Sequence, residues 1–319
     1  MFVDITGKRR YKMNLHCHTT LSDGHTTPEE TMALYAAMGY DYIAITDHWI
    51  WGERQEGEFP GPDGRPQKIC VIPGCEFDAG GGDAKKGVFH ILALDANTRP
   101  DLSKDLTRNY EMSQTEKGRL IVDRIHEAGG ISVIAHPAWS VNRPEMIEAI
   151  GGFDATEIYN SVSDFEMSDR PYSGSIVDML ADDGWYLPLL STDDSHYCTG
   201  EQGRGFIMAD ADAMDRYGLA EVVRKGLFYG VAATTAHPAD GPQVFAELID
   251  ENTVRIRTSP VCKISTFSNR TWTSGRIIRG QGLTQMDYEL NNYERYVRVE
   301  ATDEFGRVGY TNFLVTGRD

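Results

Sequence analysis

The chain has 319 residues, of which 40% are hydrophobic and 25% charged, an ordinary composition for a globular protein with a sizeable core. Its 48 acidic residues outnumber 31 basic ones, and the net charge of −17 argues against nucleic acid as a partner. The sequence has no apolar run of roughly 20 residues and no secretory signal, and its five cysteines are scattered, so we expect a cytoplasmic protein with no membrane partner.

Strand and helix patterns alternate from the N-terminus onward. The strand-type run 11–19 precedes a helix, in which Thr27 and Glu30 occupy capping-box positions, Pro28 is the first helical residue and Gly39 is the stop. Strands are expected next at 41–48, 69–77 and 88–95, followed by a helix over roughly 111–128. The polar, Gly/Pro-rich stretch 51–67 is interpreted as a loop that forms a lid or contacts substrate.

The alternation continues to about residue 235. We expect strands at 131–137, 155–160 and 186–196, and helices at 175–185 and 219–226. Strands that alternate with helices are typical of parallel sheets in the α/β class. The units are too numerous for a small open sheet, so the pattern favours a barrel.

The last 75 or so residues have a different pattern. Short β-type runs follow one another, and Val297, Val299 and Ala301 alternate with polar residues, which predicts a strand with one buried face. A hairpin is expected around Gly306. We therefore predict a barrel domain over 1–240 and a small antiparallel β-sandwich over 241–319. The second part has no histidine and is expected to pack on the barrel or to mediate a homo-oligomer contact.

Histidines concentrate where the predicted strands end. His16 and His18 flank one residue of an extended segment, so both imidazoles should point the same way, as a chelating pair would. Alone, such a pair is a weak signal. It is strengthened by further histidines at strand edges, namely His48, His90, His136 and His196.

Carboxylates accompany these histidines. Glu76 closes one strand, and Asp194 with His196 repeats the spacing of the first pair. The carboxyl ends of barrel strands converge on one face, where active sites lie. Imidazole and carboxylate without thiolate suit Zn, Mn or Fe, and the set is too large for one ion. We expect two or three divalent ions with a bridging carboxylate.

These motifs carry a family resemblance. The set "HCHTTLSDG", "ITDH", "PGCE", "FHILAL", "AHP" and "STDDSH" resembles the PHP (polymerase and histidinol phosphatase) family of metal-dependent hydrolases over about residues 11–237. The pieces "EIYNS", "SGSIVDMLADDGW", "VVRKGLFYG" and "VRVEATDEFGRVGYTNFLV" are similar to its CehA/McbA-like branch, named for carbaryl hydrolase. The resemblance implies a distorted (βα)7 TIM-like barrel of the PHP type, followed by a β-rich segment.

The resemblance also implies a division of ligands among three ions. The first ion would be held by His16, His18, Glu76 and Asp194, the second by Glu76, His90 and His136, and the third by Asp23, His48 and His196. Catalysis is expected to depend on Glu76, Asp194 and His196. Of the two aspartates in "TDDSH", the D-x-H spacing selects Asp194 as ligand, and Asp193 is expected to form hydrogen bonds nearby.

Such a site predicts hydrolysis. A water bridging two ions would lose its proton near neutral pH, and the hydroxide would attack phosphorus or a carbonyl carbon. A small phosphoester is the expected substrate, and a carbamate or ester is the alternative. A non-catalytic, metal-stabilised binding module is the alternative of another class. Arg143 and His237 are expected to contact substrate, although both fit surface positions as well. Trp139, Tyr197 and Asn160 are expected as pocket walls.

Overall fold

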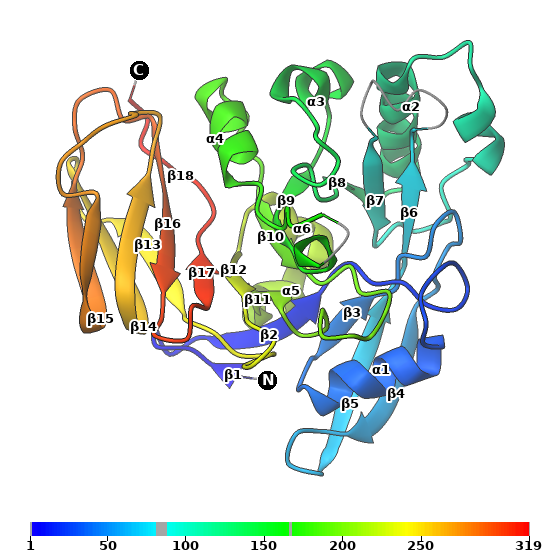
Figure 1. Ribbon diagram of the computed structural model, residues 1–319, viewed down its shortest axis with the longest axis horizontal. Helices are drawn as coiled ribbons and strands as arrows, with labels where there is room; N and C mark the ends of the chain where they lie inside the picture. The colour runs from blue at the N-terminus through cyan, green and yellow to red at the C-terminus, as the bar shows by residue number, and fades with distance from the viewer. Residues whose placement is uncertain (1, 81–87, 166–167, 319) are drawn as a thin grey trace.

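A computed structural model describes residues 2–80, 88–165 and 168–318. Their strands form two sheets of 13 and five strands, accompanied by helices, so the fold is mixed α/β as expected (Figure 1). The larger sheet runs in the order β13-β14-β16-β17-β12-β11-β2-β3-β5-β4, and the smaller one in the order β10-β9-β8-β7-β6. The C-terminal strands lie at the opposite end of the molecule from α1 and α2 (Figure 1).

The part of the large sheet that is formed before residue 240 mixes parallel and antiparallel pairs. Its strands are β1 (Phe2–Val3), β2 (Arg9–Asn14), β3 (Tyr42–Ala44), β4 (Gln55–Pro60), β5 (Pro66–Ile72), β11 (Gly205–Asp210) and β12 (Phe228–Ala232). Strands β2, β3 and β5 run parallel, whereas β11 is antiparallel to both β2 and β12.

The small sheet comprises β6 (Gly74–Asp78), β7 (His90–Leu94), β8 (Ile131–Ile134), β9 (Ala155–Asn160) and β10 (Leu189–Thr192). Strands β8, β9 and β10 are parallel, and β7 is antiparallel to its neighbours β6 and β8. Isolated bridges from His48 to Glu76 and from Cys17 to Ser195 connect the two sheets. These bridges bring the ends of strands from both sheets together.

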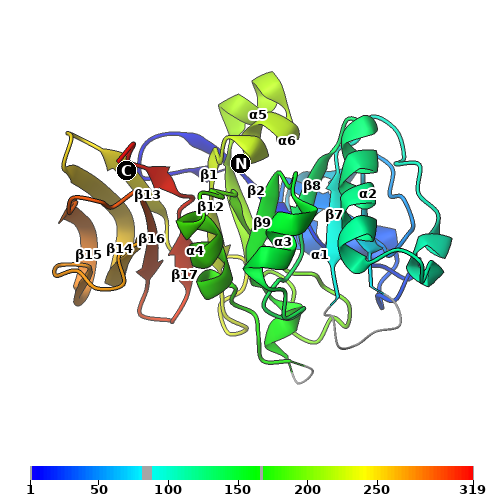
Figure 2. The ribbon, with the colours of Figure 1, turned by 90° about the horizontal axis from the view of Figure 1, so that it is seen from above.

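The α-helices are α1 (Pro28–Ala37), α2 (Gln114–Glu127), α3 (Pro144–Ile150), α4 (Gly174–Asp182), α5 (Ala211–Tyr217) and α6 (Leu219–Arg224), with short 3-10 turns at Lys104–Arg108 and Val162–Asp164. The expected start of α1 is confirmed, because Thr27 and Glu30 form a complete capping box. The chain then turns at Gly39, whose φ of +75° favours glycine. Helices α4, α3 and α2 stand in a row beside the small sheet (Figure 2).

The strand pairing supports the α/β class, with the strands arranged in two sheets. Parallel strands joined by a helix occur at β2-α1-β3, β8-α3-β9 and β9-α4-β10. The other neighbouring strands around the site are mostly antiparallel, so the distorted (βα)7 barrel stays a prediction.

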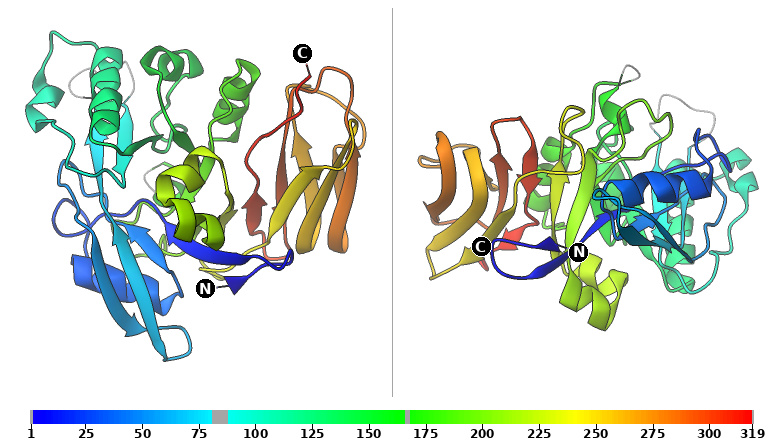
Figure 3. Two further views of the ribbon diagram at one scale, coloured as in Figure 1. Left: turned by 180° about the vertical axis from the view of Figure 1, so that it is seen from behind. Right: turned by 90° about the horizontal axis from the view of Figure 1, so that it is seen from below.

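The stretch 51–67 is not a single loop, because it contains β4 and the start of β5, so that expectation is wrong; a lid or substrate role for it stays a prediction. Strands β4 and β5 pair as an antiparallel hairpin from Gln55–Val71 to Pro60–Pro66, and α1 packs against it (Figure 3). Its exposed cross-strand contacts include an ion pair between Lys68 and Glu56 at 2.7 Å. The run has few of the β-branched residues that usually mark a strand, and its polar residues face solvent.

The C-terminal region is antiparallel β-structure, as expected. It contains β13 (Val244–Leu248), β14 (Thr253–Phe267), β15 (Ile277–Glu289), β16 (Tyr296–Thr302), β17 (Val308–Tyr310) and β18 (Leu314–Val315). The predicted hairpin joins β16 to β17 and turns at Gly306, with a φ of +80°. Because β17 pairs with β12, these strands continue the large sheet. The sandwich and the boundary at residue 240 stay predictions.

Side chains from both regions share one core. A buried cluster combines Tyr35 of α1 with Phe206, Val231, Ile256 and Val299 of the large sheet. A second buried cluster fills the space between the two sheets and includes Met13, Leu15, Leu92, Val133 and Leu190.

In the described ranges no helix is both long and apolar enough to span a bilayer.

Candidate metal centre

The expected ligands meet in one place. His16 and His18 follow β2, His48 follows β3, Glu76 lies in β6, and Asp194 and His196 follow β10. His90 begins β7 and His136 follows β8, whereas Asp23 lies in the segment before α1. The two sheets therefore supply this cluster from separate strands that are brought together by the fold.

Glu76 lies at the centre of the cluster, and its two oxygens face different histidines. Oε1 lies 2.9 Å from Nδ1 of His90 and 3.3 Å from Nε2 of His136. Oε2 lies 3.1 Å from Nε2 of His18 and 3.2 Å from Nδ1 of His48. The carboxylate is only 1% exposed. This arrangement suits a carboxylate that serves two neighbouring cations.

Asp194 faces the first histidine pair. Its Oδ1 lies 3.1 Å from Nε2 of His16 and 3.2 Å from Nε2 of His18. The backbone at Asp194 adopts a φ of +51°, and its N–H donates to the carbonyl of His16 at 2.9 Å. A positive φ is uncommon for a residue other than glycine, so local contacts hold this aspartate in place.

A third set of atoms lies nearer the surface. The Asp23 carboxylate is 56% exposed and lies 3.5 Å from Nε2 of His196 and 3.7 Å from Nε2 of His48. His18 also contributes, since its Nδ1 lies 3.5 Å from Asp23. This set therefore forms the outer edge of the cluster.

Three groups have ligand atoms that all lie within 4.8 Å of one another: His16, His18, Glu76 and Asp194; His18, Asp23, His48 and His196; and His48, Glu76 and His90. The first matches the set implied for the first ion. The second adds His18 to the set implied for the third ion. In the last group His48 takes the place expected for His136.

The buried carboxylates of this cluster favour positive charge on the groups around them. Asp194 Oδ1 and His48 Nδ1 are buried and make no well-formed hydrogen bond within the described residues. Burial lowers the pKa of His16, but the charges of Asp194 and Glu76 outweigh it and raise that pKa well above 6.5. Burial opposes protonation of His18 as well, yet contacts with the same two carboxylates raise its pKa to about 9.

The carboxylate of Glu76 shows the same pattern. Burial alone would raise its pKa, but the positive charge of surrounding histidines, His90 foremost, holds the pKa well below its usual range. The cluster thus brings imidazole nitrogens and carboxylate oxygens together without a cation between them. Such a set of donor atoms is typical of a divalent metal site. The residues therefore fit divalent ions.

A cavity of about 150 Å³ opens onto the cluster. Its aromatic walls are the expected Trp139 and Tyr197, with ring centroids 4.9 Å from His136 and 5.6 Å from His196 respectively. Val162 and Ser163 also line the cavity. Among the residues that the structure describes, neither lysine nor arginine lines this cavity.

The two expected substrate contacts lie elsewhere. Arg143 is exposed at the N-cap of α3, and His237 is exposed with its ring 4.4 Å from that of Phe305. Neither lines the described cavity. A role for either residue with a large substrate stays a prediction.

Supporting residues were missed by sequence reasoning. Glu157 contacts Nδ1 of His16 at 2.8 Å, and the hydroxyl of Ser140 lies 3.0 Å from Nδ1 of His136. The available signal was the single acid of the expected strand 155–160, at the start of the motif "EIYNS"; once that strand is buried, an unpaired charge would be costly. Asp193 behaves as expected: it accepts hydrogen bonds from Tyr35 and from the backbone of residues 203–205.

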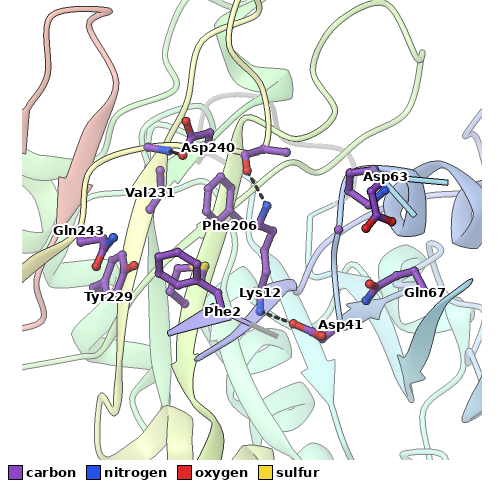
Figure 4. Close-up of a pocket in the computed structure, with 15 residues that line it drawn as sticks. Phe2, Lys12, Asp41, Asp63, Gln67, Phe206, Tyr229, Val231, Asp240 and Gln243 are labelled. Carbon is purple, nitrogen blue, oxygen red and sulfur yellow. Dashed lines mark hydrogen bonds between the residues drawn. The ribbon is translucent and has the colours of Figure 1, made fainter. Parts of the chain in front are cut away.

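A larger cavity of about 430 Å³ is separate from the cluster, because none of the expected ligands lines it. Lys12 crosses its middle, between Phe206 and Asp41 (Figure 4). The ammonium donates to the backbone carbonyls of Met38 and Ala239. This lysine therefore ties the end of α1 to the chain that leads into the C-terminal strands.

Comparisons with known proteins support the fold and give a partial sequence match. No family model matches the chain. The 5'-3' exoribonuclease Rnm of Salmonella typhimurium is 32% identical over 123 residues, which are 36% of this chain and 38% of that protein. The chain thus matches well under half the length of this curated relative.

Solved structures match over a greater length. A two-domain protein from Bacteroides vulgatus, described as containing a predicted PHP-like metal-dependent phosphoesterase, is 15% identical, with a TM-score of 0.52 over 98% of both chains. An amidohydrolase from Chromobacterium violaceum is 19% identical over 59% of this chain and 89% of its own, with a TM-score of 0.38. The first similarity supports a shared fold across the whole chain.

Proposed function

We propose that this protein is a metal-dependent hydrolase of the PHP type, and that it acts on small phosphoesters. One observation carries the proposal: the two oxygens of the buried Glu76 face separate sets of histidine nitrogens, with Asp194 opposite. A bridging carboxylate between two cations requires this arrangement. The fold shared with the Bacteroides vulgatus protein and the partial match to the exoribonuclease are consistent with it.

Two or three Zn, Mn or Fe ions would be held by the nine residues of the cluster. His16, His18, Glu76 and Asp194 would hold the first; Glu76, His90 and His136, with His48 close by, the second; and Asp23, His48 and His196 the third. When bound, such ions supply Lewis acidity and lower the pKa of a coordinated water. Glu76 would keep neighbouring cations together by placing its negative charge between them.

The chain's own groups explain how substrate would be placed. The cavity of about 150 Å³ suits a small reacting group, and the rings of Trp139 and Tyr197 shield its sides from water. Because no basic side chain of the described residues lines it, an anionic phosphoryl group would depend on the ions for its neutralisation.

The same lining favours a second candidate activity. A neutral carbamate or ester needs no basic side chain, so hydrolysis of the carbaryl type also fits this cavity. That activity would accord with the CehA/McbA-like branch to which the sequence motifs are similar.

The test is a turnover panel with the intact protein. We expect p-nitrophenyl phosphate or bis-p-nitrophenyl phosphate to be hydrolysed when Mn²⁺ or Zn²⁺ is present, and Asp194→Asn to be inactive although folded by circular dichroism. Turnover of naphthyl methylcarbamate alone would select the second activity. Failure to hydrolyse any of the three, with metal demonstrably bound, would overturn the proposal.

A further inference from the structure

Glu157 is a buried carboxylate that joins four segments around the metal centre. It projects from β9, is 0% exposed and is not among the residues that line the cavity. Its Oε1 lies 2.8 Å from Nδ1 of His16 and accepts from the hydroxyl of Thr192 at 2.6 Å. Its Oε2 accepts from the backbone N–H of His136 at 2.7 Å and from the amide of Asn160 at 2.9 Å.

These contacts use the whole hydrogen-bonding capacity of the carboxylate, which has about four lone-pair sites. Each oxygen has two partners, so rotation of the group would break several bonds at once. Glu157 is therefore held rigidly, and it can orient the groups that it touches.

The contact with His16 determines which ring nitrogen faces the centre. A carboxylate accepts but does not donate, so Nδ1 of His16 must carry the proton that it shares with Glu157. Nε2 is then the nitrogen that lies 3.1 Å from Asp194 and 3.5 Å from Glu76, and its lone pair would be available to a metal ion held by these groups. A carboxylate behind a histidine also raises the basicity of the ligating nitrogen.

The contact with His136 supports an unusual backbone. His136 has a φ of +30°, outside the range that residues other than glycine favour. Its N–H is fixed by Glu157, whereas Nδ1 of its ring faces the neutral hydroxyl of Ser140, at 3.0 Å. The ring of His18 likewise has the neutral hydroxyl of Ser22 near its Nδ1, at 3.3 Å. A carboxylate hydrogen-bonded to Nδ1 thus distinguishes His16, a ligand implied for the first ion, from His18 and His136.

We propose that Glu157 is a positioning residue that orients His16 and makes the His16–His18–Glu76–Asp194 site the tightest of the metal centre. This inference rests on the proposed function, because it requires that the cluster bind divalent ions. Replacing a residue behind a metal ligand typically weakens metal affinity about 10- to 100-fold. We expect that loss to fall mainly on the first equivalent of metal.

The test titrates Co²⁺ into metal-stripped full-length protein and follows both visible absorbance and heat. Wild type should bind a first equivalent most tightly, with the absorbance of a mixed nitrogen and oxygen site. Glu157→Gln should weaken that equivalent at least tenfold and alter its spectrum, and should leave later equivalents within about threefold. Glu294→Gln is the matched control, because Glu294 is equally buried and hydrogen-bonded but lies in the C-terminal region. It should leave the titration unchanged.

The titrations can support or overturn the proposed role of Glu157. An unchanged first equivalent and spectrum in Glu157→Gln, or equal weakening of every equivalent, would overturn the inference. If that variant fails to fold, Glu157→Asp keeps the charge but withdraws it from His16, and it should show the same selective loss. If both are unfolded even with metal, Glu157 serves the fold and the inference is wrong. A wild type that binds no Co²⁺, Zn²⁺ or Mn²⁺ would instead refute the proposed function.

Discussion

The Nε2 atom of His18 lies 3.1 Å from Oε2 of Glu76, with both side chains at most 1% exposed. A neutral imidazole and a carboxylate presenting lone pairs to each other at this distance would repel. Burial would make that repulsion stronger, because the surrounding dielectric is low. A proton or a metal ion must therefore lie between them, and the following predictions begin from that requirement.

Glu76→Gln should abolish turnover and lower bound metal by more than one equivalent, because an amide cannot neutralise two neighbouring cations. His196→Ala should cost about one ion and a smaller part of the activity, since His196 faces the exposed Asp23 at the outer edge. Elemental analysis and rates on the same folded preparations check this. A Glu76→Gln protein with full metal content and near-normal rates would rule out the bridging role.

Metal affinity should increase with pH up to about 9. In the metal-free protein the pKa of His18 is raised to about 9 by Asp194 and Glu76, although burial opposes the shift. A metal binds the neutral ring, so binding near pH 7 must release the proton that His18 holds. Calorimetry in buffers of different ionisation enthalpy should detect at least one proton released. Binding without proton release, and with affinity independent of pH, would contradict this account.

Arg298→Met should destabilise the fold by about 3 kcal/mol while leaving the metal content unchanged. The Arg298 side chain is 1% exposed and contacts Asp178 of α4 through Nε at 2.6 Å and Nη2 at 2.7 Å. Its Nη1 also donates to the buried Glu300, so its loss leaves a buried carboxylate without its cation and breaks the contact with the partly exposed Asp178. Urea unfolding and elemental analysis provide the two measurements.

A matched control for this variant is available on the surface. Arg255 makes the same two-pronged contact with Asp287, at 2.9 and 2.7 Å, but both side chains are 36% exposed. Arg255→Met should therefore cost less than about 1 kcal/mol. Equal effects of the two variants would mean that the buried contact does not hold the C-terminal strands to α4.

Lys12 should make stability depend on pH in the alkaline range. Burial lowers its pKa from 10.5 to about 8, whereas an unfolded chain keeps this proton up to about pH 10.5. Between these values the unfolded state binds more protons, so the wild type should gain stability relative to Lys12→Met as pH rises from 8 to 10. Urea midpoints of the two proteins measure this. Parallel curves over that interval would show that the folded protein does not depress the pKa of Lys12.

Features set by neighbouring residues could be predicted from the sequence. The capping box of Thr27 and Glu30 depends on residues three apart, so the start of α1 is visible in the sequence and confirmed in the structure. The histidine and carboxylate motifs at strand ends indicated a common site, and the structure places those side chains together.

Features that depend on distant partners were not predictable in the same way. The pairing of β12 with β17 joins residues about 80 positions apart, and no local pattern specifies it. Strand β4 lacks the usual strand composition, and its place in the hairpin depends on pairing with β5 and packing on α1. Glu157 is the first residue of the motif "EIYNS", but its role follows only from His16 and His136 lying against it.

Metal content tests the central claim most directly. Full-length protein purified without chelator should contain two or three equivalents of Zn, Mn or Fe by elemental analysis, or take them up when metal is supplied. More than one equivalent is required if Glu76 serves two ions. A reproducible value near zero, with no uptake on addition of any of these metals, would contradict the account.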